Sequence, residues 1–181
     1  MRGTSFVAFA ALVISGCAPP ATQLIVSVDT DLPIPGELDE ITVSVRVGST
    51  AVETESTRLT TRSGLPLTLS VIPEGESLGP IVVIATGLHD GAVVLERSAE
   101  VTLVRGETRV LPLFLLAGCV GVSCPRAGET CGENGCAPRL IPDPPPWTGT
   151  PPVIGMDAGT ADAAREGGMG DTLSLIHIRC V

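Results

Sequence analysis

The stretch that decides the fold is residues 41–47, which read Ile41-Thr42-Val43-Ser44-Val45-Arg46-Val47. Apolar side chains occupy every odd position and polar side chains every even one. Because successive side chains of a β-strand point to opposite faces of the sheet, this alternation predicts a strand with one buried face. No helical stripe of apolar residues of useful length competes with it anywhere in the chain.

The two-residue period recurs on both sides of this stretch, most clearly in residues 65–71 and 97–103. Three runs are apolar enough for central strands, and they occupy residues 24–28, 81–85 and 110–115. Residues 49–63 are polar and rich in Thr, which predicts a weak strand or one at a sheet edge. The stretch between residues 22 and 116 therefore holds six or seven short strands.

The segments between these strands carry turn residues. Asp90-Gly91 supplies the two positive-φ positions that a tight hairpin needs, and we expect Arg105-Gly106-Glu107 to do likewise. In size and strand number, residues 22–116 match an immunoglobulin-like antiparallel β-sandwich. The predicted fold class is all-β. The Cys and Trp landmarks of antibody domains are absent, and the architecture by itself assigns no function.

The first residues have the character of an export signal. Met1-Arg2 gives a positive start, and residues 6–14 are uninterruptedly apolar. That run is shorter than the roughly 20 residues needed to span a bilayer but fits the apolar region of a signal peptide. Ile14-Ser15-Gly16-Cys17 looks like a lipobox, the pattern that lipoprotein-processing enzymes read. The alternative is an ordinary signal peptide that happens to contain a cysteine.

The lipobox resemblance implies a bacterial lipoprotein with a signal peptide over residues 1–16, cleaved between Gly16 and Cys17. Its anchor would be a diacylglyceryl group on the Cys17 sulfur, joined by a further acyl chain. Residues 17–21 would be the lipidated cysteine and a short extended tether. Ala18 does not resemble an inner-membrane retention signal, so the expected location is the cell envelope, at the outer membrane.

Four cysteines follow the last strand with the spacing C-x4-C-x6-C-x4-C, and they are Cys119, Cys124, Cys131 and Cys136. An even number of cysteines in an exported chain predicts a small disulfide module, here over residues 117–137. Three connectivities are possible, and we favour the interleaved one, Cys119 with Cys131 and Cys124 with Cys136. The alternative is a zinc site, although structural zinc motifs usually have closer C-x2-C pairs.

The run from Ala127 to Cys136 resembles the small Cys-rich modules that follow sandwich domains in surface lipoproteins of myxobacteria and their relatives. Together with the lipobox, this resemblance covers most of the chain. It implies a surface lipoprotein and carries no assigned activity.

Residues 138–172 are rich first in Pro and then in Asp, Ala and Gly, which predicts a disordered linker. Residues 173–181 look foreign to the chain. They can be encoded by a transposon end used to prepare sequencing libraries, followed by its own reverse complement. We therefore expect them to be a sequencing-adapter artefact, with the true chain continuing beyond Thr172. The alternative is a genuine short tail.

The charge balance is acidic, with 20 Asp and Glu residues against 11 Lys and Arg residues and a net charge of -9. All 11 basic residues are Arg. An acidic chain repels a phosphate backbone, so nucleic acid is not an expected partner.

No catalytic arrangement is recognisable in the sequence. His89 stands beside Asp90-Gly91 as a turn residue, and no G-x-S-x-G nucleophile motif or Gly-rich phosphate loop is present. Weak calcium candidates lie near one end of the predicted sandwich, and they are Asp29, Asp31, Asp39 and Glu40. Their spacing does not match an EF-hand, and Asp is common in strand-end turns, which is the favoured interpretation. We expect no cofactor.

These observations predict a non-enzymatic envelope lipoprotein whose sandwich is a spacer or an interaction module for binding or adhesion. Its expected partners are the membrane, through the lipid, and an envelope glycan or protein. One alternative is the anchoring stalk of a larger protein whose functional domain follows residue 172. Another is a secreted hydrolase whose site is not recognised.

Overall fold

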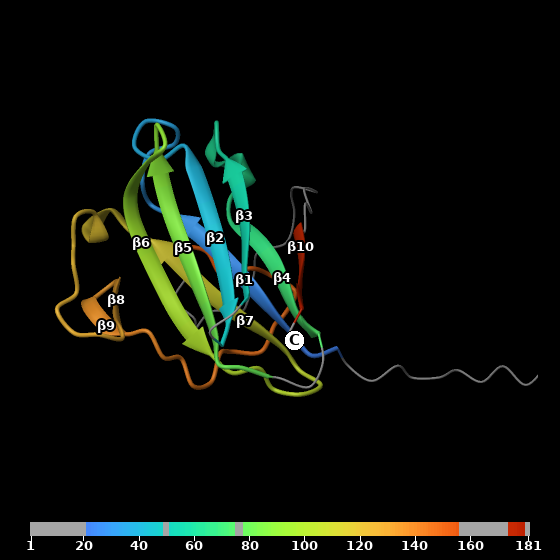
Figure 1. Ribbon diagram of the computed structural model, residues 1–181. Helices are drawn as coiled ribbons and strands as arrows, with labels where there is room; N and C mark the ends of the chain where they lie inside the picture. Colours follow the sequence, from blue (N-terminus) through green and yellow to red (C-terminus); the bar gives the residue numbers. More distant parts are fainter. Residues whose placement is uncertain (1–20, 49–50, 75–77, 156–173, 180–181) are drawn as a thin grey trace, which may run out of the picture.

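The alternating stretches form strands, and β2 (Glu40–Val47) shows why. Its side chains Ile41, Val43 and Val45 are buried, while Thr42, Ser44 and Arg46 are partly or fully exposed. The computed structural model describes residues 21–48, 51–74, 78–155 and 174–179 (Figure 1). The other strands of the sandwich are β1 (Gln23–Thr30), β3 (Ala51–Arg58), β4 (Leu67–Glu74), β5 (Ile81–His89), β6 (Ala92–Val101) and β7 (Thr108–Leu115).

The signal peptide expected at residues 1–16 and the lipidation site Cys17 lie outside the described residues, as does the linker from residue 156 to 172. Among the described residues, no helix is both long and apolar enough to cross a membrane.

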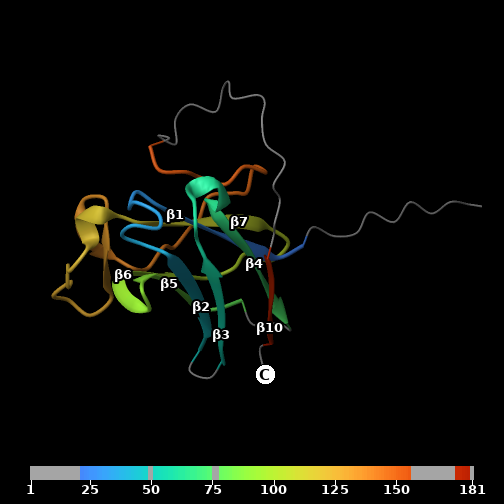
Figure 2. The same cartoon turned by 90° about the horizontal axis from the view of Figure 1, so that it is seen from above.

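Two sheets face each other across the core (Figures 1 and 2). One has the order β3-β2-β5-β6 and is antiparallel throughout, with β3 at its edge as the polar sequence predicted. The other has the order β10-β4-β1-β7. The predicted all-β sandwich is confirmed.

The strand order differs from the immunoglobulin arrangement that the sequence suggested. In an immunoglobulin constant domain the first, second, fifth and fourth strands share a sheet. Here the second and fifth strands instead join the third and sixth, and β1 pairs with β7 in parallel register over Gln23–Thr30. The sandwich is therefore not wholly antiparallel.

The sequence predicted two tight hairpin turns, and the structure confirms one of them. Asp90 and Gly91 have φ values of 50° and 76° and connect β5 to β6 as a tight hairpin, as predicted. Arg105-Gly106-Glu107 was expected to do the same, and this was wrong. Gly106 has a φ of 73°, but the chain crosses there from β6 in one sheet to β7 in the other.

The core lies between the sheets and consists of branched aliphatic side chains. Leu24, Val26 and Val28 of β1 face Val43, Val45 and other inward residues of the opposite sheet, and all are almost completely buried. Gly87 of β5 has no side chain because Leu38 and Leu95 occupy that space: an added Cβ would lie 2.6 Å from Leu38 Cδ1 and 2.9 Å from Leu95 Cδ2.

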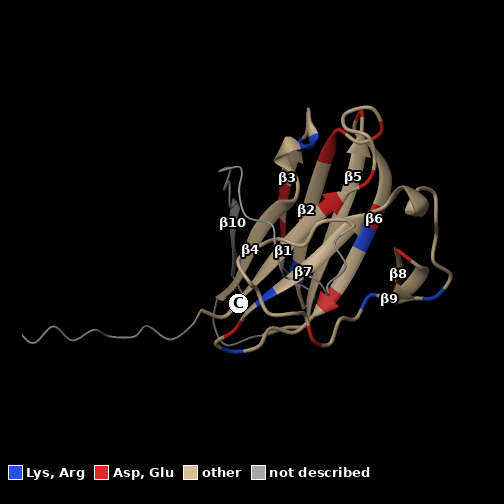
Figure 3. Ribbon diagram, turned by 180° about the vertical axis from the view of Figure 1, so that it is seen from behind, with Lys and Arg blue, Asp and Glu red and all other residues tan. Residues whose placement is uncertain are grey.

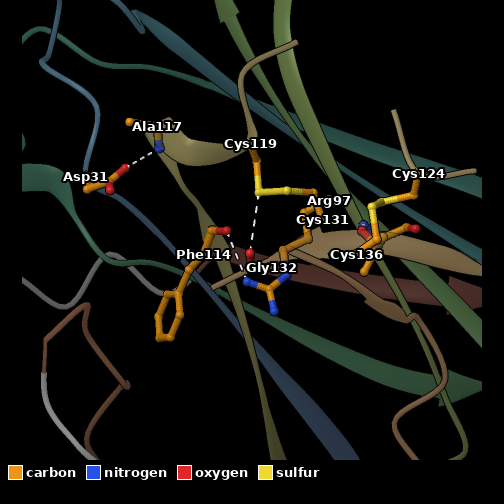
Figure 4. Close-up of a disulfide and its surroundings, with 11 residues drawn as sticks. Asp31, Arg97, Phe114, Ala117, Cys119, Cys124, Cys131, Gly132 and Cys136 are labelled. Carbon is orange, nitrogen blue, oxygen red and sulfur yellow. Dashed lines mark hydrogen bonds between the residues drawn. A yellow bond between two sulfur atoms is a disulfide. The ribbon is translucent and has the colours of Figure 1, made fainter. Parts of the chain in front are cut away.

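The four cysteines form the small module predicted after the sandwich (Figure 4). Disulfides join Cys119 to Cys131 and Cys124 to Cys136, which is the interleaved pairing. The zinc alternative is set aside, because both pairs are oxidised. The module consists of a short 3-10 turn η2 (Ala117–Cys119) and a hairpin of β8 (Glu129–Gly132) and β9 (Gly135–Pro138).

The first part of the expected linker is not free but runs along the sandwich. Residues 139–141 pair with β6, where Glu100 N–H donates to Arg139 C=O at 2.8 Å and Ile141 N–H donates to Glu100 C=O at 2.9 Å. Farther on, Val110 N–H of β7 donates to Pro145 C=O at 2.9 Å, and Trp147 N–H donates to Thr108 C=O at 3.0 Å. The segment thus bonds to Glu100 near the end of β6 and to the first residues of β7.

Residues 150–155 then cover the outer face of β1. Ser27 Oγ donates to Pro152 C=O at 3.3 Å, and Ile154 N–H donates to Asp29 Oδ2 at 3.1 Å. Figure 2 shows this orange segment on the side of β1 and β7 that faces away from β2 and β5. It explains why seven consecutive residues of β1 are buried, on both faces of the strand. The disordered-linker prediction was therefore wrong for residues 138–155.

The remaining strand is β10 (Ser174–Arg179), within the stretch that we expect to be an artefact. It pairs with β4 in parallel register, from Ser174 opposite Leu69 to Arg179 opposite Glu74. The origin of residues 173–181 stays a prediction.

Candidate functional site

A recess in the described surface lies between the edges of β3 and β4, where the chain crosses from one sheet to the other. The crossing contains a short 3-10 turn, η1 (Arg62–Gly64). Here the two sheets leave a cleft of about 830 Å³. A volume of this order is typical of sites that hold small ligands or short peptide segments.

The floor of the cleft is apolar. Ile41 and Val43 contribute from β2, and Leu67 and Leu69 from β4. These side chains are on the inward faces of their strands, and Ile41, Val43 and Leu69 belong to the buried core. A ligand in the cleft would therefore touch the sandwich core at its open side.

The rim is polar and comes mainly from β3. Glu55 pairs with Val43 and Thr57 with Ile41 in the strand register. Since directly paired residues have their side chains on the same face of a sheet, Glu55 and Thr57 are on the cleft side of β3. Further rim residues are Arg58, Thr60, Thr61, Ser63 and Thr68.

Two of the rim residues have defined partners. Arg58 Nε lies 3.7 Å from Glu40 Oε2, and the Thr61 and Ser63 hydroxyls lie 2.6 Å apart. The described lining contains no His or Cys that could serve as a base or a nucleophile. The arrangement can bind by apolar contact and hydroxyl hydrogen bonds, with a carboxylate at one side.

Carboxylates and arginines lie mostly at strand ends and in connecting loops, as Figure 3 shows for the described residues. The four calcium candidates are among them, but they do not form one cluster. Within the described part of the chain, no three His, Cys, Asp or Glu side chains gather closely enough to hold a metal ion.

Each of the four candidates instead interacts with a group of the protein. Asp29 is buried and accepts hydrogen bonds from Thr30 N–H at 2.8 Å and Ile154 N–H at 3.1 Å. Asp31 accepts from Ala117 N–H at 2.6 Å, and Asp39 from Asp90 N–H at 3.0 Å. Glu40 is the ion-pair partner of Arg58. These contacts tie loops and strand ends together, mostly between residues far apart in the sequence.

His89 stands at the β5–β6 hairpin, as expected for a turn residue. Its Nδ1 lies 3.7 Å from Asp39 Oδ2, and its Nε2 lies 3.7 Å from Asp90 Oδ2. Nδ1 is buried and makes no hydrogen bond among the described residues. His89 does not line the cleft.

Arg97 of β6 was not singled out by the sequence reasoning. It occupies an inward-facing position between Leu95 and Ala99, and its Nη1 donates to Phe114 C=O of β7 at 3.1 Å (Figure 4). Gly132 of the disulfide module lies against the Arg97 guanidinium. A Cβ added at Gly132 would lie 3.5 Å from Arg97 Nη2.

Burial lowers the pKa of the Arg97 guanidinium, and the Glu133 carboxylate partly opposes this shift. The sequence signal for Arg97 was the alternation of residues 97–103, because it places this Arg on the same face of the strand as buried side chains. Arg97 bridges the two sheets on the side away from the cleft.

No protein-family model matches the chain, and neither the curated proteins nor the solved structures that were compared with it gave a match.

Proposed function

We propose that this chain is a lipid-anchored protein of the bacterial cell envelope whose sandwich is a non-enzymatic binding module. The observation that carries the binding role is the cleft of about 830 Å³ between β3 and β4. The lipobox-like sequence ending at Cys17 supports the anchor.

The chemistry of the lining favours binding over catalysis. Leucine, isoleucine and valine form the floor, and threonine and serine hydroxyls form much of the rim. Such a surface gives an apolar contact area with a few polar groups that orient a ligand. Envelope glycans and extended protein segments are the two ligand classes that fit it.

A filled cleft tests the binding role. Thr57→Trp adds a large side chain on the cleft side of β3, whereas Ser56→Trp adds the same side chain on the opposite face, where Ser56 bonds to Thr42. Each variant is immobilised and its retention of purified envelope glycan fragments and envelope-protein peptides is measured. We expect Thr57→Trp to lose a ligand that the parent chain and Ser56→Trp both retain. Equal retention by the two variants, or none by the parent chain, would contradict the proposal.

A labelling experiment tests the anchor. In cells grown with a clickable palmitate analogue, the parent chain should incorporate the label and Cys17→Ser should not. Labelling that persists in Cys17→Ser would overturn the lipoprotein assignment.

A further inference from the structure

The outer edges of the two sheets differ in the groups that pair with them. An edge strand presents unpaired N–H and C=O groups that can accept a further strand. In the described part of the chain, residues 139–141 bond to Glu100 of β6, and residues 145–147 bond to Thr108 and Val110 of β7. The edges of β3 and β4 border the cleft.

The β3 edge is protected by charge. Glu53 and Glu55 pair with the buried residues Val45 and Val43, so both carboxylates are on the inward face of an edge strand. Inward-pointing charges on an edge strand oppose the addition of another strand, since the pairing would draw them out of water.

The β4 edge carries less charge. Residues 67–72 read Leu-Thr-Leu-Ser-Val-Ile and contain no charge, and the strand ends in Pro73-Glu74. The strand β10 occupies this edge, in parallel register from Leu69 to Glu74, and it also lies close to β3 (Figures 1 and 2). Because Leu69 also lines the cleft, a strand added to β4 begins beside the cleft.

We propose that the β4 edge is a strand-acceptor site, at which an extended segment of a partner protein adds in parallel to β4 beside the cleft. The inference rests on the proposed binding function and names the ligand as an extended peptide. The peptide would alternate apolar and polar residues and be neutral or basic, since Glu53 and Glu55 stand on the facing strand. Backbone hydrogen bonds would supply the affinity.

The identity of β10 strengthens this reading. The sequence predicts that residues 173–181 are foreign to the chain, and they nevertheless pair with β4 in register. Within β10, residues 176–179 read Ile-His-Ile-Arg and alternate apolar and polar side chains, ending in a basic residue.

The test releases β10 and adds the strand back in trans. In the full chain, Ile176→Pro with His177→Pro removes two neighbouring N–H groups, one of which faces β4 in any strand. A fluorescein-labelled peptide of sequence TLSLIHIRS, which is residues 172–180 with Ser for Cys180, is titrated into this variant and into the parent chain. Anisotropy should show saturable binding to the variant and at least about tenfold weaker binding to the parent, in which tethered β10 competes.

Two methylated peptides provide the matched control. One is N-methylated at the residues corresponding to 174, 176 and 178, and the other at 175, 177 and 179. Because alternate N–H groups of a strand point to the same neighbour, one peptide should bind at least about tenfold more weakly and the other nearly as well as the parent peptide. Equal binding of both peptides, or no saturable binding to a variant that melts like the parent chain, would overturn the inference. If the first double variant does not fold, Ser174→Pro with Leu175→Pro repeats the release.

Failure of the peptide titration can be distinguished from failure of the earlier retention test with glycans and peptides. Glycan retention lost only in Thr57→Trp, together with no peptide addition at β4, would leave the proposed function standing and overturn the strand-acceptor site. Peptide addition that follows the alternate methylation pattern supports the site.

Discussion

Replacing Asp29 by Asn probes how the Pro-rich segment is held against the sandwich. Asp29 is only 5% exposed. One carboxylate oxygen accepts from Thr30 N–H at 2.8 Å and lies 3.5 Å from Arg62 Nη2, and the other accepts from Ile154 N–H at 3.1 Å. An Asn can keep the first acceptor, but its NH₂ group then faces the N–H of Ile154, so two donors meet.

The expected cost follows from the bond that is lost. A hydrogen bond to a charged group contributes about 1.5–3 kcal/mol to stability, so Asp29→Asn should lower the unfolding free energy by about 2 kcal/mol. For a folded part of this size, that corresponds to a fall in Tm of about 6 °C. The half-exposed ion pair with Arg62 adds little, because solvent screens it.

Calorimetry and amide exchange measure the two consequences. Asp29→Asn should melt earlier and lose exchange protection at Ile154, whereas Asp90→Asn, at a side chain that is 89% exposed, should change stability by less than about 0.5 kcal/mol. Unchanged melting with Ile154 still protected would refute the role assigned to Asp29. We also expect calcium to leave the Tm of the parent chain unchanged. A calcium-dependent rise that Asp29→Asn abolishes would restore the ion-site interpretation.

Gly87→Ala should cost about 1–3 kcal/mol, because its Cβ would lie 2.6 Å from Leu38 Cδ1, while Gly118→Ala, with no atom within 4 Å, should be nearly neutral in the same denaturant titration. Equal effects of the two substitutions would contradict the packing described around Gly87. Replacing Cys119 and Cys131 together by Ser opens a crosslink with a sequence separation of 12 and should cost about 3 kcal/mol. Mass spectrometry of unreduced digests should recover that pair and the Cys124–Cys136 pair, and a Cys119–Cys124 crosslink would count against the fold of the module. A chain ended at Ala137 should melt below one ended at Gly155, since the edges of β6 and β7 lose their cover. Identical melting curves would show that residues 138–155 do not stabilise the sandwich.

The strands themselves could be predicted because their signal is local. The alternation in residues 41–47 indicates a strand with one buried face, and β2 has that burial pattern. The tight turn at Asp90-Gly91 is equally local, since two positive-φ residues suffice to define it.

Pairing and cover could not be predicted in this way, because they depend on distant residues. Nothing in the sequence of β1 says that β7 lies beside it in parallel, or that Pro152 and Ile154 bury its outer face. The Pro-rich composition of residues 142–152 suggested disorder because it offers few side chains to bury. That segment is held mainly through backbone hydrogen bonds, which composition does not report.

The candidate site shows the same limit. Glu55 and Thr57 belong to a stretch whose polarity indicated only a weak or an edge strand, and Leu67 belongs to a stretch predicted as an alternating strand with one buried face. The cleft exists because β3 and β4 lie in different sheets, and the crossing between them was not visible in the pattern. The calcium candidates were predicted as a group from closeness in sequence, but they bond to four different parts of the fold.

The way residues 150–155 follow β1 has a mechanical consequence. The strand β1 begins at Gln23, and the later segment meets the far end of the same strand, at Asp29. In a chain held at Cys17, a pull on the residues beyond 155 would act along the strand, over about 25 Å. The pull would reach β1 through the Ile154 N–H to Asp29 Oδ2 and Ser27 Oγ to Pro152 C=O hydrogen bonds, whereas all eight residues of β1 are in register with β7. Those two bonds would therefore break before the strand pairing, and residues 150–155 would peel from β1 while the sandwich stays intact.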